Sequence, residues 1–195
     1  MRTAQSPEIS AGFLLTLAGA VLLLPLNWLL AAAGAAIFHE LCHLLALRIC
    51  SGQVQHIHFG PKGAVIHALP LSPAKALLCT LAGPLGALLL LPLARWFPRL
   101  ALCAAVQSAY NLLPVAGLDG GHVLSCCLAL FLPPREVEVV CHRVEVTVMV
   151  LVGGLGLWGT FILKLGLLPV LAAGLLISKG MNGKIPCKSR PMRVQ

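Results

Sequence analysis

Residues 34–47, GAAIFHELCHLLAL, place two histidines and a glutamate inside an otherwise apolar run. Residues four apart stack on one face of a helix, so His39 and His43 can both offer an imidazole nitrogen to one metal ion. Glu40 follows the first histidine and is placed to reach water on that metal as a general base. The stretch therefore predicts a helix that carries two zinc ligands and the catalytic residue Glu40.

The rest of the chain has the composition of a membrane protein. Of its 195 residues, 58% are hydrophobic and 10% are charged, whereas soluble domains carry roughly 25% charged residues. At about 20 residues for each span, the length allows about six transmembrane helices. We expect an all-α polytopic membrane protein with one catalytic domain over residues 1–178, whose core is 27–132, and a basic tail over 179–195.

Apolar runs and turn residues predict where the helices lie. Five segments read as continuous spans: 11–26, 27–49, 73–93, 144–163 and 165–178. A broken span occupies residues 100–132, with a helix to about 112, an irregular segment at 114–117 and a second helix from about 119. The charged residues 133–143 are expected to separate this span from the next.

A small membrane-associated β-hairpin is predicted after the second span. Residues 53–59 and 64–69 form two short alternating runs, with a turn around Pro61–Lys62. His56 and His58 share one face of the first run and resemble a metal pair, but an interfacial hairpin is the simpler interpretation.

The net charge of +8 fixes the expected orientation. With six spans, all lysines and arginines except Arg95, Arg99 and Lys164 fall on the side of the termini, which the positive-inside rule assigns to the cytoplasm. His43 lies five residues before Arg48, about 8 Å along a helix, so the metal is expected in the inner half of the membrane, nearer the cytoplasm. Basic and aromatic residues do not interleave as in proteins that stack bases, so no nucleic-acid partner is expected.

A catalytic zinc takes three protein ligands, and the third candidate is Asp119, the one aspartate of the chain. It lies in NLLPVAGLDGGH (residues 111–122), within another apolar segment. Asp119 also suits a helix N-cap, and the two histidines also suit plain helix packing. The eight cysteines are interpreted as packing residues, since no C-x-x-C pair is present. His122 is interpreted as a packing residue as well.

HELCH on one span and NLLPVAGLDGG on a later one resemble the site-2 protease family of intramembrane zinc metalloproteases. The family pattern N-x-x-P-x-x-x-x-D-G is matched at Asn111, Pro114, Asp119 and Gly120. The resemblance implies one Zn²⁺ for each chain, held by His39, His43 and Asp119, with Glu40 as the base. The six expected spans, the hairpin after the second span and the metal near the cytoplasmic side resemble the bacterial branch that includes a sporulation protease acting on a sigma-factor precursor. This resemblance implies a bacterial cytoplasmic or forespore membrane.

The resemblance also implies the partners: a membrane protein or membrane-associated peptide as substrate, the lipid bilayer, and a membrane regulatory protein. Asn111 and Pro114 are candidates for substrate contact. Two other functions remain open at this stage. Intramembrane His, Glu and Asp also mark metal or ion transporters, and a catalytically silent scaffold would bind membrane helices without cleaving them.

Overall fold

A computed structural model describes residues 24–52, 54–60, 63–69 and 71–162, with short pieces nearer both ends. The predicted spans at 11–26 and 165–178, and most of the tail, lie largely outside the described residues. The chain divides into two compact units, one formed by residues 1–112 with 189–195 and the other by residues 113–188. Each unit is described by itself.

Helix α2 (Leu26–Ile49) buries every fourth residue. The buried positions are Ala31, Ala35, His39, His43 and Leu47. Large apolar side chains on the remaining surface are exposed, including Ile37, Leu41 and Leu45. Small and polar groups inside with large apolar groups outside are the arrangement expected of a helix that faces lipid and packs through its small residues.

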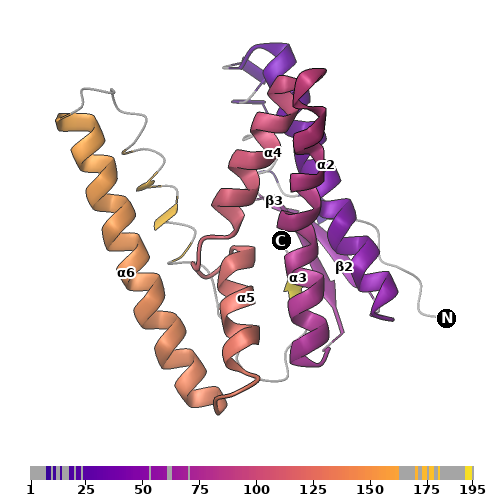
Figure 1. Ribbon diagram of the computed structural model, residues 1–195, viewed down its shortest axis with the longest axis vertical. Coiled ribbons are helices and arrows are strands. Elements are labelled where there is room, and N and C mark those ends of the chain that lie inside the picture. Colours follow the sequence, from indigo (N-terminus) through magenta and orange to yellow (C-terminus); the bar gives the residue numbers. More distant parts are fainter. Residues whose placement is uncertain are drawn as a thin grey trace. The chain divides into compact units, whose positions relative to one another are not determined.

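Two further helical segments pack against α2 in this unit. Helix α3 (Pro73–Ala87) continues into the 3-10 helix η1 (Leu88–Arg95), and α4 (Pro98–Asn111) follows. Figure 1 shows α2, α3 and α4 side by side. Ala35, Ala87 and Ala104 meet in a buried cluster with Leu90, so that the small residues allow close packing.

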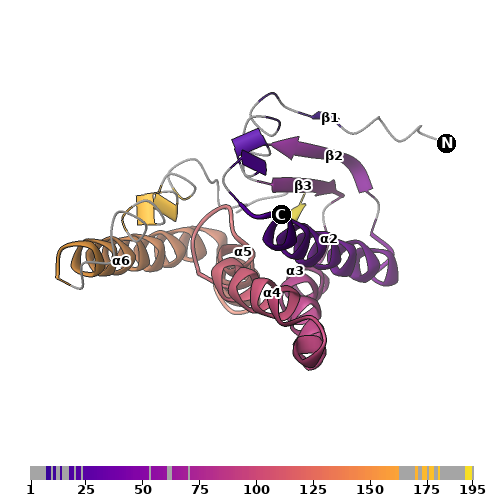
Figure 2. The same ribbon diagram turned by 90° about the horizontal axis from the view of Figure 1, so that it is seen from above.

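The strands of this unit form one sheet in the order β1-β2-β3-β4. Strands β2 (Val54–Gly60) and β3 (Gly63–Ala68) pair antiparallel over the two alternating runs, with Ile57 opposite Ile66. Figure 2 shows these strands on one side of α2. The outer strands, β1 (Glu8–Ile9) and β4 (Met192–Val194), were not expected. Part of the predicted tail thus pairs with β3.

The second unit contains α5 (Asp119–Leu128) and α6 (Pro134–Phe161), which are in contact. The predicted fifth span at 144–163 is wrong at its start, because α6 begins at Pro134. Proline is favoured in the first turn of a helix, where its missing N–H costs nothing. The charged residues at 135, 136, 138 and 143 face outward while Val137 and Cys141 are buried, so they belong to one face of a helix.

Within the described part of the chain, three helices are long and apolar enough to cross a membrane. They are Leu26–Ile49, Pro73–Arg95 and Pro134–Phe161. These lengths and compositions are those of a membrane protein. The six-span count, the orientation and the interfacial position of the hairpin stay predictions.

Candidate metal and active site

The two histidines of the opening motif face each other from successive turns of α2. His39 and His43 are 0% and 1% exposed, and their ring centroids lie 4.7 Å apart at an interplanar angle of 84°. Their Nε2 atoms are 3.1 Å apart. Two zinc-bound imidazole nitrogens at tetrahedral geometry lie about 3.3 Å apart. The pair therefore fits two ligand positions on one zinc ion.

The Nδ1 nitrogen of the His43 ring takes part in a hydrogen bond with the backbone. Its Nδ1–H donates to the backbone carbonyl oxygen of Cys79 on α3, at 2.8 Å. This bond leaves Nε2 as the unprotonated nitrogen, directed at His39. Metal-binding histidines usually donate their other N–H in this way, which fixes both tautomer and ring orientation.

The His43 ring has room on α3 because residue 83 is a glycine. A Cβ atom at Gly83 of α3 would collide with the His43 imidazole. One turn further along, a Cβ atom at Gly86 would collide with Cys42. The glycines of LAGPLGA (residues 81–87) therefore let the α3 backbone approach α2 directly beside His43 and Cys42. Ser108 of α4 donates to the Pro84 carbonyl at 2.9 Å and ties this part of α3 to α4.

Asp119 is the first residue of α5 and is fully buried. Leu118 occupies the N-cap position, so Asp119 lies one residue inside the helix. The preceding turn contains Gly117 at φ 84°, a conformation that other residues rarely adopt. A Cβ atom at Gly121 would collide with the Val115 carbonyl, so glycine lets the turn lie against α5.

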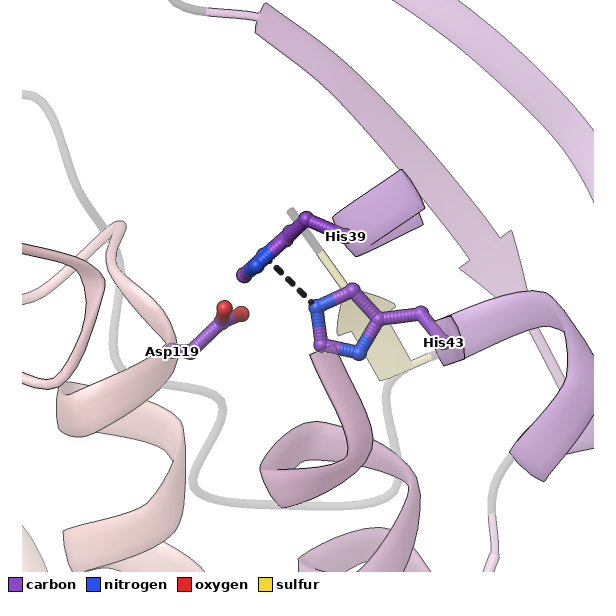
Figure 3. A group of neighbouring side chains, drawn as sticks. All are labelled: His39, His43 and Asp119. Atoms are coloured by element: carbon purple, nitrogen blue, oxygen red, sulfur yellow. Dashed lines mark hydrogen bonds between the residues drawn. The ribbon is translucent and has the colours of Figure 1, made fainter. Parts of the chain in front are cut away.

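The two histidines and Asp119 form a group of candidate metal ligands. One ligand atom from each residue lies within 4.8 Å of the others (Figure 3). Two imidazole nitrogens and a carboxylate oxygen are the donor set of catalytic zinc sites. The role of each residue as a ligand stays a prediction.

The other predicted site residues lie on α2, on α4 and in the segment that leads to α5. Glu40 is partly buried on α2, next to His39 in the chain. Asn111, the last residue of α4, places Nδ2 3.4 Å from His39 Nε2. Pro114 is partly buried in the segment that leads to α5, and His122 is buried on α5. Substrate contact by Asn111 and Pro114 stays a prediction, although Asn111 is now seen beside a histidine of the motif.

Glu145 is a second buried acid among the described residues, after Asp119, and it stands near the start of the predicted span at 144–163. Its burial was not predicted from the sequence. Glu145 is 7% exposed on α6, and its Oε1 accepts a hydrogen bond from the Ala116 N–H at 2.8 Å. The signal was present, since Val137, Cys141 and Glu145 follow one another at four-residue spacing. The charged residues around Val137 concealed that pattern.

No protein-family model matches the sequence, and no curated protein matches it. Among solved structures, the chain is similar to the site-2 protease from Methanocaldococcus jannaschii, with a TM-score of 0.66 and 17% sequence identity. The similarity covers 91% of this chain and 89% of that chain. The chain therefore has a fold similar to that of this site-2 protease.

Proposed function

We propose that the protein is an intramembrane zinc metalloprotease that hydrolyses a peptide bond in or near a membrane-associated segment of a substrate protein. The observation that carries the proposal is the group of His39, His43 and Asp119 in a chain with a site-2 protease fold. Apolar helices supply the membrane context. Placement in the sporulation branch has no support beyond the sequence motifs.

The three buried residues would hold one Zn²⁺. His39 and His43 would bind through Nε2, the nitrogens that face each other, and Asp119 through a carboxylate oxygen. When bound, the metal supplies the Lewis acidity that makes water nucleophilic near neutral pH and polarises the scissile carbonyl.

Glu40 would act as the general base for the attacking water. Its carboxylate accepts a proton from the attacking water and later gives it to the leaving amine. Its neighbour His39 is buried and turned toward His43, so the α2 backbone positions the base beside the metal ligands. Asn111, which lies near His39 Nε2, and Pro114 would contact the substrate at the same site.

The substrate backbone must leave its helix before it can be cleaved, because helical carbonyls are hydrogen-bonded. An extended substrate segment could join the sheet that contains β2 and β3 as an added strand. The expected partners are thus a membrane-embedded substrate, the surrounding lipid and a membrane regulatory protein.

The deciding experiment replaces Glu40 by Gln, which keeps the shape of the side chain and removes the base. We expect the rate of cleavage of co-expressed single-span substrates to fall by roughly a hundredfold to ten-thousandfold. The product size is followed by gel electrophoresis, and zinc content is measured on the same preparations. Full cleavage by Glu40→Gln, or metal transport by wild type without any cleavage, would contradict the proposal.

A further inference from the structure

A carboxylate outside the predicted catalytic set is buried in the second unit. Glu145 lies on the buried face of α6, one turn after Cys141 and two turns after Val137. An ionisable group in such a position is expensive to bury and is normally kept for a specific partner. The partner of Glu145 is a backbone N–H in the turn that leads to Asp119.

That hydrogen bond anchors the turn three residues before Asp119. The Ala116 N–H donates to Glu145 Oε1 at 2.8 Å, and the Leu118 N–H donates to the Val115 carbonyl at 3.1 Å. Gly117 lies between them at φ 84°. With both N–H groups fixed, the direction in which the chain enters α5 is fixed as well.

Close packing holds the same turn on two further sides. Val115, Ala116 and Leu118 are all buried. A Cβ atom at Gly121 would collide with the Val115 carbonyl, and one at Gly180 would lie 2.9 Å from Val115 Cγ1 and 3.0 Å from Glu145 Oε1. The carboxylate and the turn therefore have little room to shift without breaking the bond between them.

We infer that Glu145 is a positioning residue, which directs Asp119 toward the metal by holding the 115–118 turn through the Ala116 N–H. The inference rests on the proposed function, because it assigns Asp119 to the metal. Glu145 itself touches neither metal nor substrate in this account. Its effect belongs to the class of outer hydrogen bonds that orient metal ligands, whose loss typically weakens metal affinity about 10- to 100-fold.

The test measures the zinc affinity of the full chain in detergent by competition with a chelator. We expect Glu145→Met, which removes the acceptor, to weaken zinc affinity about 10- to 100-fold. Glu145→Gln keeps an oxygen acceptor and should stay within a few-fold of wild type. Glu138→Met is the matched control, because Glu138 is exposed on the same helix; it should bind zinc as wild type does.

A double-mutant cycle separates positioning from general stability. On an Asp119→Ala background, Glu145→Met should weaken zinc affinity no further, because the ligand that it positions is gone. An equal loss on both backgrounds would overturn the inference. If Glu145→Met does not fold, Glu145→Asp replaces it: the charge remains and the acceptor retreats by one methylene, so affinity should still fall, and wild-type affinity would overturn the inference.

Failure of the inference and failure of the proposed function give different results. A wild type whose zinc affinity depends on His39 and Asp119 but not on Glu145 overturns the inference alone. A wild type that binds no zinc, or whose zinc is unaffected by His39→Ala, overturns the proposed function and the inference with it.

Discussion

His43 has three separate constraints on one imidazole ring. Its Nδ1–H is bonded to the Cys79 carbonyl, its Nε2 faces His39, and the ring lies over the bare backbone of Gly83. Two of these constraints come from α3 and the third from α2 itself. A ligand fixed in this way loses little further entropy when metal binds, which favours a preorganised site.

Gly83→Ala tests how much the metal site depends on that backbone approach. The added Cβ atom would collide with the His43 imidazole, so either the ring turns and its bond to Cys79 breaks, or α3 moves away from α2. We expect zinc affinity to fall about tenfold or more and overpacking to cost about 1–3 kcal/mol of stability. Chelator competition and thermal unfolding measure the two effects.

Gly154→Ala is the matched control, because a Cβ atom there would meet nothing within 4 Å. Both substitutions lie in helices and both raise intrinsic helix propensity. The control should therefore keep zinc affinity and wild-type stability or better. Wild-type zinc affinity in Gly83→Ala would show that the ring position does not depend on this glycine.

At the scale of elements, α2 buries every fourth residue along its length, and the first part of α6 does the same at Val137, Cys141 and Glu145; both buried faces carry a polar group. The pattern was predictable in α2, since His39 and His43 stand alone in apolar surroundings. In α6 it was not recognised, because exposed charges at its start resemble a loop. The break between α4 and α5 was predictable, because Pro114 and the glycines after it disfavour a continuous helix.

The sheet shows why other parts of the fold could not be predicted. The two alternating runs indicate strands through a local period of two. Strands β1 and β4 are two and three residues long and come from opposite ends of the chain. No local pattern is that short, and their pairing is decided by contacts distant in sequence. The Glu145–Ala116 hydrogen bond and the close approach of Gly83 to His43 could not be predicted either, because each joins residues that are distant in sequence.

Ile57→Pro tests the proposed part of the sheet in substrate binding. Ile57 lies within β2, opposite Ile66 of β3, and proline would remove one backbone donor from the strand. If an extended substrate joins this sheet, cleavage should fall at least tenfold while zinc content stays at the wild-type level. The histidine pair lies on α2, so a local change in β2 leaves the metal ligands in place.

Ile57→Val is the control for that substitution, because it keeps the N–H and a β-branched side chain. It should cleave substrate as wild type does. Unchanged cleavage by Ile57→Pro would show that the sheet takes no part in substrate binding. Loss of zinc together with cleavage would mean that the sheet supports the fold instead of the substrate.

At the scale of the whole molecule, several polar groups are buried while many large apolar side chains are exposed among the described residues. The buried polar or charged residues include His39, His43, Asp119 and Glu145, whereas large apolar residues such as Leu22, Ile49 and Phe161 are mostly exposed. A surface of this kind is stable only against lipid, because exposed apolar area in water favours association. We therefore expect the bilayer to cover this surface.

The orientation in that bilayer is the last prediction, and it follows from charge. Nearly all lysines and arginines fall on the side of the termini if six spans are present, and transferring that many charges outward would oppose the positive-inside rule. Green fluorescent protein fused after Gln195 should therefore fluoresce in a bacterial host, and alkaline phosphatase at the same point should be inactive. Phosphatase fused after Phe97, between the arginines Arg95 and Arg99, is the control and should be active. An active C-terminal phosphatase would mean an odd number of spans or the opposite orientation, and the opposite orientation would place the proposed metal site in the outer half of the membrane.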